Sequence, residues 1–213
     1  MVQAAPTAAA ERAAPPAAAY TAVPMDAGDS DEALMLRFAA GEAGAFDLLY
    51  ARHRTGLYRF VLRQLGRERH LADEMVQDVW TSLIAARTGY KPSARFGTWL
   101  YTIARNRVVD HHRRLRPVDL PGQHEDDVDP VQHHPAPATA QPERIAQGRQ
   151  QAARLLALVE VLPVAQREAF LLHEEGGLNV DEIAAVTGAD REAVKSRLRY
   201  ALARLRQGME GVL

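Results

Sequence analysis

The feature that most constrains the fold is the spacing of apolar residues, which recur every three or four positions through most of the chain. From Ser30 onward this helical period runs through segments near 31–40, 46–66, 70–86 and 96–114, and it resumes at Ile145. A half-buried strand would instead alternate at every second residue, and no useful length of the sequence does so. Abundant alanine and few aromatic residues also favour helix. The sequence therefore predicts an all-α protein.

A proline-rich, acidic segment divides this helical pattern in two. From Pro117 to Pro142 the chain carries six prolines, with Asp, His and Gln between them, a composition typical of an extended linker. We therefore expect two small helical domains, 28–116 and 143–213, joined by a flexible acidic linker over 117–142 and moving independently. Residues 1–27 are mostly Ala, Pro and small polar residues, so we expect a disordered tail there.

Several functional classes are excluded by what the sequence lacks. It has no cysteine and no apolar run long enough to cross a membrane, so we expect a cytoplasmic protein without disulfides or membrane insertion. It has no Gly-rich phosphate loop, Ser/His/Asp signature or HExxH motif, so we expect no catalytic residue and no cofactor. The histidine pairs at 111–112 and 133–134 do not share a helix face, and His70 with the acids after it fits a helix start. We therefore expect no metal site.

The net charge of −1 conceals two basic segments. Residues 105–116 hold five arginines and one Asp, and residues 191–206 hold six Lys or Arg and one Glu. Local basic patches of this kind are what contact with nucleic-acid phosphates requires.

The second basic segment follows a helix-turn-helix pattern, "VDEIAAVTGADREAVKSRL". Asn179 with Glu182 predicts a capping box, Gly188 a left-handed turn, and Asp190 the cap of the second helix. The outer face of that helix would present Arg191, Lys195, Ser196 and Arg199. Such residue types contact guanine edges and phosphates in the major groove, so we expect this helix to bind DNA.

The first basic segment ends the stretch "FGTWLYTIARNRVVDHHRR", which begins with aromatic residues and finishes in cations. If Leu100, Ala104 and Val108 face the core, the opposite side carries an aromatic ring, an amide and cations. Stacking on aromatics beside a basic track is typical of single-strand binding. The alternative is that Trp99 and Tyr101 pack against neighbouring helices.

These stretches, together with "HLADEMVQDVW" and "LPVAQREAFLLHEEGGLNV", resemble an extracytoplasmic-function (ECF) RNA polymerase sigma factor of the sigma-70 class. The resemblance covers about 31–116 and 143–208. It implies a factor that binds core RNA polymerase, directs it to specific promoters and promotes DNA opening. The implied partners are promoter DNA and the β′ clamp helices and β flap of the polymerase. Whether an anti-sigma factor exists is left open.

The resemblance also implies a role for each motif. "ADEMVQDVW" resembles the helix that docks on the clamp helices, and its polar face carries Asp73, Glu74, Gln77, Asp78 and Thr81. "GYKPSARFGTWL" resembles the loop that captures a flipped base, and the helix after it resembles the reader of the −10 element. The implied −10 residues are Phe96, Trp99, Asn106, Arg107, Arg113 and Arg114. "DREAVKSRLRYALARLR" resembles the −35 recognition helix, with Arg191, Lys195, Ser196 and Arg199 as the contacts.

The sequence departs from the family pattern in three places: "EEGGLN" after "AFLLH" is more acidic, the linker is long and His-rich, and the tail has no counterpart. The alternative function is a two-domain helix-turn-helix regulator that binds duplex DNA without polymerase. It accounts for residues 178–206 but leaves the docking helix and the −10 helix without a role.

Overall fold

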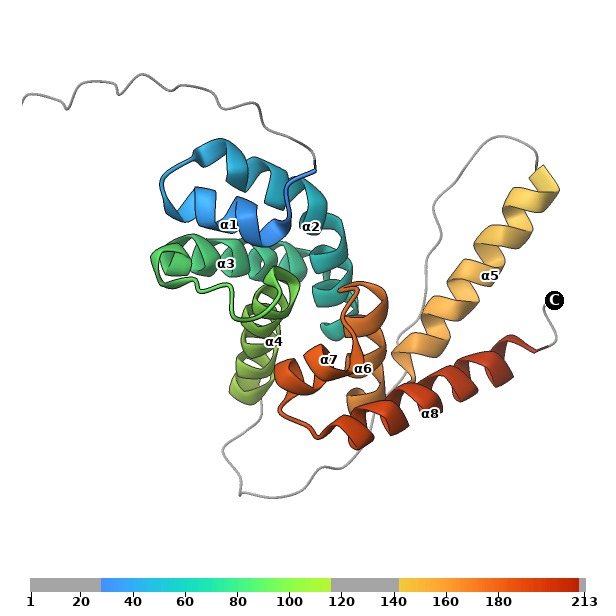
Figure 1. Ribbon diagram of the computed structural model, residues 1–213. Coiled ribbons are helices and arrows are strands. Elements are labelled where there is room, and N and C mark those ends of the chain that lie inside the picture. Colours follow the sequence, from blue (N-terminus) through green and yellow to red (C-terminus); the bar gives the residue numbers. More distant parts are fainter. Residues whose placement is uncertain (1–27, 116–141, 211–213) are drawn as a thin grey trace, which may run out of the picture.

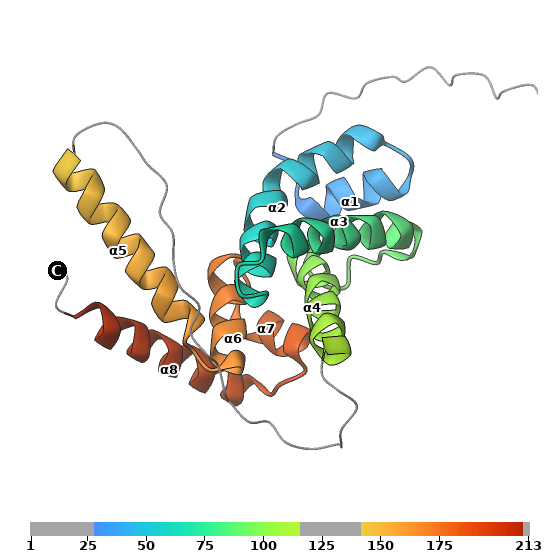
Figure 2. The same ribbon diagram turned by 180° about the vertical axis from the view of Figure 1, so that it is seen from behind.

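A computed structural model of the chain describes residues 28–115 and 142–210, except for the side chains of 142–147. Over these ranges the chain is all-helical (Figures 1 and 2). The N-terminal domain, 28–115, contains α1 (Asp31–Ala39), α2 (Ala43–Gln64), α3 (Arg69–Ala86), the 3₁₀ turn η1 (Arg87–Gly89) and α4 (Phe96–Leu115). The C-terminal domain, 142–210, contains α5 (Pro142–Glu160), α6 (Val164–Glu174), α7 (Val180–Thr187) and α8 (Arg191–Met209). The all-α prediction is confirmed. The expected tail and all of the expected linker except Pro142 lie outside the described residues.

Local capping residues set where α1, α7 and α8 begin, and the sequence predicted the caps of α7 and α8. The Ser30 hydroxyl accepts a hydrogen bond from the Ala33 amide and starts α1. Asn179 forms a complete capping box with Glu182 at the start of α7, and Gly188 ends that helix at φ 69°. Asp190 then caps α8. Each cap satisfies backbone amides that the first turn leaves unpaired, which typically contributes about 1 kcal/mol.

The core of the N-terminal domain forms where the apolar stripes of its helices meet. Leu57 and Phe60 of α2, Val79 of α3 and Leu100 of α4 are fully buried, as is Leu34 of α1. Burying each such side chain contributes about 1.5–3 kcal/mol. This core fixes α3 and α4 side by side, with the polar face of each helix directed outward.

The C-terminal domain is a four-helix unit in which α8 is the common element. α6 and α7 both pack on α8 through Leu171, Ile183 and Val194, which are fully buried. α5 packs along the second half of α8, where the Arg154 side chain donates to the Gly208 carbonyl. This packing leaves the first turns of α8 exposed at the edge of the domain.

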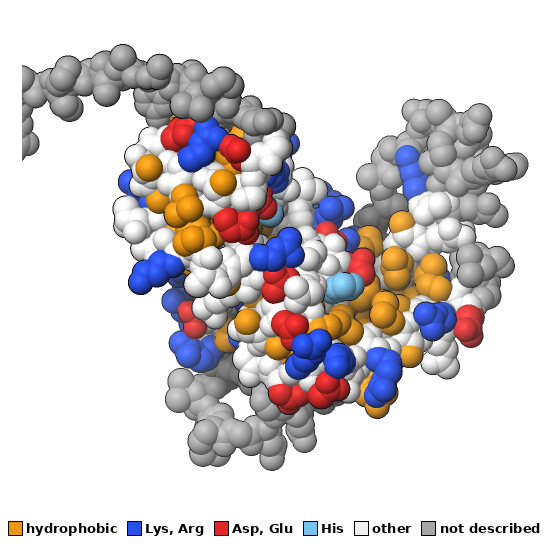
Figure 3. Space-filling view, viewed as in Figure 1, with side chains coloured by type: hydrophobic (Ala, Val, Ile, Leu, Met, Phe, Trp, Pro, Cys, Tyr) orange, Lys and Arg blue, Asp and Glu red, His pale blue; other side chains and the backbone are white. Residues whose placement is uncertain are grey.

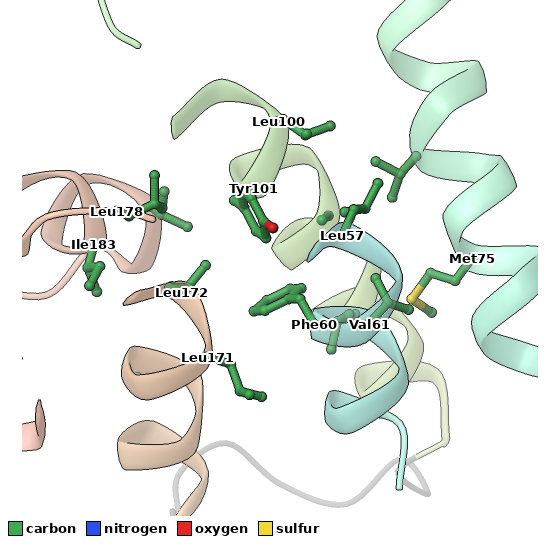
Figure 4. Packing of buried hydrophobic residues seen from close by; sticks show 14 of the residues in the cluster. Leu57, Phe60, Val61, Met75, Leu100, Tyr101, Leu171, Leu172, Leu178 and Ile183 are labelled. Carbon is green, nitrogen blue, oxygen red and sulfur yellow. The ribbon is translucent and has the colours of Figure 1, made fainter. Parts of the chain in front are cut away.

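The two domains touch, which differs from the expectation that they move independently. α4 packs on α7 and α2 packs on α6. Phe60 and Tyr101 from the N-terminal domain face Leu172 and Leu178 from the C-terminal domain in one continuous buried cluster (Figure 4). The sequence did not predict this contact, because the apolar stripe of each helix could be explained by packing within its own domain.

Candidate functional site

The polar face of α3 lies fully at the surface. All five residues predicted to dock on polymerase are exposed: Asp73, Glu74, Gln77, Asp78 and Thr81. Glu74 has an ion-pair partner, His70, at 3.6 Å. Among the described residues, neither Asp73 nor Asp78 forms an ion pair within the chain. The α3 face therefore keeps negative charge available for a partner.

An apolar groove of about 680 Å³ runs beside this face, between α2 and α3. Asp73, Gln77 and Thr81 form part of its wall. Tyr50 is 39% exposed and Ile84 is 36% exposed, so large apolar surface faces the solvent there. A groove with an apolar lining and polar residues along its edge is typical of a protein-docking surface. We call the α3 face and this groove together the docking surface.

Tyr50 and Ile84 were not predicted from the sequence as surface residues. Tyr50 lies at a position where the helical spacing of apolar residues in α2 predicts a buried side chain. Only the tertiary structure shows that its ring, 5.1 Å from the ring of Trp80, lines a groove. Ile84 follows the polar face of α3 in the sequence, whereas Tyr50 lies on another helix and gave no such signal.

The outer face of α4 carries most of the residues predicted to meet the −10 element. Asn106, Arg107, Arg113 and Arg114 are exposed. Arg107 reaches back to the Ser82 hydroxyl of α3 at 2.7 Å, and Arg113 pairs with Asp110 at 3.2 Å. Surface pairs of this kind are worth little in water, so both guanidinium groups can be redirected to phosphate.

Trp99 lies half-buried at the start of the same helix. Its ring is 5.0 Å from the ring of Tyr90 and 6.3 Å from that of Phe96. The loop that precedes α4, residues 91–95, is exposed. Trp99 thus packs on two aromatic rings and remains partly exposed next to an exposed loop. Its role in binding an unstacked base stays a prediction.

Phe96, which the resemblance implies as a −10 residue, is buried in this structure. Its side chain is 0% exposed, and its ring lies 5.0 Å from that of His53 on α2. The Phe96 amide donates to the Glu32 carboxylate at 2.8 Å, and this bond is the main cause that lowers the pKa of Glu32. Phe96 therefore anchors the first turn of α4 to α1 and α2. The helical period placed this side chain at the start of a helix but could not show that its ring packs against α2.

The outer face of α8 carries the four residues predicted to contact the −35 element. Arg191, Lys195 and Arg199 are exposed, and Ser196 is partly buried. Arg191 pairs with Asp181 of α7 at 2.9 Å, and Lys195 pairs with Glu192 at 2.7 Å. The Arg199 guanidinium lies 5.0 Å from the centre of the Tyr200 ring. The structure thus brings the predicted contacts onto one exposed face at the start of α8.

The described residues were compared with the requirements of a metal site and of a membrane-spanning helix, and they meet neither. Within 28–115 and 142–210 no group of three or more His, Asp or Glu side chains could hold a metal ion. Over the same ranges no helix is long and apolar enough to span a membrane. The histidines at 133–134 lie outside the described residues.

These features define a class: a two-domain, all-helical protein with an exposed helix-turn-helix and a second basic helix on a separate domain. Comparison with known proteins identifies the family. A model of Sigma-70 region 2 matches residues 49–117, and a model of Sigma-70, region 4 matches residues 152–205. The chain belongs to the ECF RNA polymerase sigma factors of the sigma-70 class.

Individual relatives agree with this assignment. The chain is 32% identical over 173 residues to RNA polymerase sigma factor CarQ of Myxococcus xanthus, which covers 81% of this chain and 94% of CarQ. It is 32% identical over 176 residues to ECF RNA polymerase sigma factor SigM of Mycobacterium tuberculosis, covering 83% of each.

Two solved structures show the same fold. The structure of CnrH in complex with the cytosolic domain of CnrY aligns with a TM-score of 0.60 at 26% identity, covering 84% of this chain and 96% of CnrH. The sigma factor RpoE in complex with the anti-sigma factor NepR from Bartonella quintana aligns with a TM-score of 0.58 at 21% identity, covering 78% of this chain and 97% of that one.

Proposed function

We propose that this protein is the promoter-recognising subunit of a bacterial RNA polymerase, acting in the cytoplasm, and that each of its three outward faces has a separate partner. The docking surface binds core polymerase, the α4 face reads the −10 element, and the first turns of α8 read the −35 element. The observation that carries this proposal is that each face is exposed and lies within a segment matched by sigma-70 region 2 or region 4.

Polymerase binding rests on the docking surface. Its exposed acids lie beside an apolar groove, so a helical partner with basic and apolar side chains would find complementary chemistry in one place. A second contact follows from the apolar side chains gathered where α5 and α8 lie side by side (Figure 3). Leu155 of α5, Val161 just after α5 and Leu202 of α8 are exposed apolar side chains. We assign this patch to the β flap.

DNA opening rests on the order of residues along α4. Asn106 offers an amide that reads a base edge, and Arg107, Arg113 and Arg114 offer charge to phosphates. The accessible part of Trp99 offers a surface on which an unstacked base can rest. Stacking on an aromatic ring contributes roughly 1–3 kcal/mol per base, which offsets the cost of unstacking.

Recognition of the −35 element rests on the rigid start of α8. The Asp190 cap and the positive-φ Gly188 fix the direction of the helix relative to α7. Helix N-termini favour phosphate, so the first turn can set the position on the backbone while Lys195 and Arg199 reach the groove.

The docking assignment is tested by a double variant, Gln77→Ala with Asp78→Arg. Both residues are exposed, so the melting temperature should stay close to that of the parent, while affinity for core polymerase should fall at least about tenfold. Asp47→Arg is the matched control, because it makes the same charge reversal at an exposed position of α2 away from the groove. A double variant that retains the parent affinity would refute the assignment.

The alternative regulator is distinguished by binding to duplex DNA without polymerase. A repressor or activator should bind its site tightly alone, whereas a sigma factor should bind promoter DNA well only as holoenzyme. Run-off transcription with core polymerase across genomic DNA would identify the promoters at the same time.

A further inference from the structure

The start of α4 cannot take a side-chain cap from the residue directly before it. That residue is Arg95, whose guanidinium carries only donors and so offers no acceptor to the amides of a first helical turn. The Phe96 amide instead donates to the carboxylate of Glu32 at 2.8 Å. Glu32 belongs to α1 and lies 64 positions earlier in the chain, so a distant helix supplies the cap of α4.

The chemistry of this contact suits a helix start. Anionic groups are favourable there, because the first amides and the positive end of the helix dipole point toward them. Glu32 is in the first turn of α1, and the hydroxyl of Ser30 caps that turn in its own right. The bond from Phe96 holds the pKa of Glu32 below its usual range, so the carboxylate is charged at neutral pH. Glu32 is therefore a charged acceptor on a helix whose own start is fixed.

The same edge of α1 also meets the other end of the loop 91–95. Tyr90 directly precedes this loop and is 8% exposed, and α1 contacts both η1 and α4. Burial raises the pKa of Tyr90, and the charges of Glu32 and Asp31 raise it further, which places both carboxylates near the phenol. Tyr90 and Phe96, the residues on either side of the loop, are thus both set against α1.

Asp31, the neighbour of Glu32, fixes α1 to α2. Its carboxylate lies 2.7 Å from Nε2 of His53 and accepts a hydrogen bond from Arg52 at 2.7 Å. The ring of His53 in turn lies 5.0 Å from the ring of Phe96. Two adjacent carboxylates therefore tie α1 to α2 and to α4 at once, and this double attachment resists any displacement of the cap.

Trp99 depends on the turn that Glu32 caps. Its amide donates to the Arg95 carbonyl at 3.3 Å and closes the first turn of α4. Its ring lies between 5.0 and 6.3 Å from the rings of Tyr90 and Phe96. The orientation of the Trp99 ring is therefore set by the two residues that α1 holds.

The part of α4 that carries the predicted −10 amide is fixed in another way. Asn106 lies about 15 Å beyond Phe96 at a rise of 1.5 Å per residue. Leu100 and Ala104, between them, are fully buried, so core packing holds this part of the helix. Loosening the first turn should therefore affect Trp99 without moving Asn106.

We propose that Glu32 is a positioning residue for DNA opening: it fixes the first turn of α4, and with it Trp99 and the loop 91–95, before any base leaves the duplex. The effect on DNA rests on the proposed function, whereas the cap itself does not. A surface already held in its binding geometry loses less conformational entropy when a base stacks on it. Because bases stack there only after they part, Glu32 acts on strand opening and not on the closed complex.

The cap is tested in the free, full-length protein by amide hydrogen exchange followed by NMR. Glu32→Ala should speed exchange of the Phe96 and Trp99 amides about fivefold, the fold-change that corresponds to the loss of one helix cap. Exchange over 57–61 in the core of α2 should stay unchanged. Glu32→Gln keeps an acceptor oxygen at the same place and should restore most of the protection. Equal exchange in Glu32→Ala and the parent would overturn the proposal.

Opening is measured with holoenzyme on a promoter found by run-off transcription. A 2-aminopurine base in the −10 element gains fluorescence when it unstacks and so reports the rate of opening. Glu32→Ala should open the intact promoter about fivefold more slowly, while the closed complex, formed on ice, should bind as tightly as that of the parent. A template mismatched across the −10 region should remove most of the difference, because its bases are already unpaired.

Glu42→Ala is the matched control for a general loosening of α1. Glu42 is also a carboxylate attached to α1, since it accepts from Arg37 at 2.8 Å, but this bond joins α1 to the start of α2. Glu42→Ala should therefore open promoters at the parent rate even where its melting temperature falls. Equal slowing by Glu42→Ala and Glu32→Ala, or a Glu32→Ala defect that the mismatched template leaves unchanged, would overturn the positioning role.

The two measurements separate this proposal from the proposed function. If the parent holoenzyme opens no promoter, the proposed function is refuted, while hydrogen exchange still decides whether Glu32 caps α4. If the parent opens promoters and Glu32→Ala opens them at the same rate, the positioning role of Glu32 is overturned and the proposed function stands.

Discussion

Replacing Phe96 by alanine should destabilise the N-terminal domain rather than remove a DNA contact. The side chain is fully buried under α1 and α2, and removing such a phenylalanine costs about 3–5 kcal/mol. This loss is a large share of the roughly 5–15 kcal/mol that separates folded from unfolded states in ordinary domains. We therefore expect a markedly lower urea midpoint for Phe96→Ala.

Trp99→Ala should have a smaller effect on stability and a larger one on DNA opening. Its two ring contacts contribute about 0.5–1.5 kcal/mol each, hence about 1–3 kcal/mol together. Asn106→Ala, at an exposed position, should stay within about 0.5 kcal/mol of the parent. Phe96→Ala, Trp99→Ala and Asn106→Ala thus distinguish a loss of core packing from a loss of DNA recognition within α4.

The assay combines urea unfolding, followed by circular dichroism, with transcription from two templates. One template is an intact promoter, and the other is mismatched across the −10 region so that its bases are already unpaired. Trp99→Ala should recover much of its activity on the mismatched template, because the cost of unstacking is removed. Asn106→Ala should lose discrimination at one −10 base on both templates.

One result would refute this reasoning. If Phe96→Ala kept the parent urea midpoint but lost activity only on the intact template, the buried position of Phe96 would not describe its function. A Trp99→Ala variant that unfolds and gains nothing from the mismatched template would show that Trp99 is a core residue.

Three further predictions concern the other faces and the caps. Lys195→Ala and Arg199→Ala should weaken promoter binding by holoenzyme. If the lost contact is to a phosphate, the slope of log affinity against log salt concentration should become shallower by about 0.9. If it is to a base, specificity should be relaxed at one promoter position. Asn179→Ala removes the capping box of α7 and should cost about 1 kcal/mol in thermal unfolding, with an Asn179→Asp control close to the parent. The lowered pKa of Glu32 adds stability that is present above its unfolded pKa near 4.5 and is lost as the pH falls through its folded pKa. The difference in melting temperature between the parent and Glu32→Gln should therefore shrink on acidification below about pH 5, and a difference that is constant with pH would contradict this.

Features set by neighbouring residues were predictable from the sequence. The capping box at Asn179, the turn at Gly188 and the cap at Asp190 depend on atoms within four residues, so their sequence signature and their structure coincide. The exposed face of α3 followed from helical spacing for the same reason.

Features set by distant parts of the chain were not predictable. The ring of Phe96 is buried against His53 of α2, which lies 43 positions earlier, and Tyr50 is exposed because α2 and α3 leave a groove between them. The domain interface was concealed in the same way. Glu175 did stand out as an acid where the family pattern differs, but only the structure shows the arginines that it meets.

The glycine at position 56 also has a genetic meaning. Every single-base change that replaces this glycine by another amino acid introduces a Cβ, and any Cβ at this position meets the Glu175 carbonyl. Alanine is a better helix former than glycine, so this replacement should leave α2 itself folded. A one-step mutation at this codon is therefore expected to push α2 away from the segment after α6 and so to weaken the contact between the two domains.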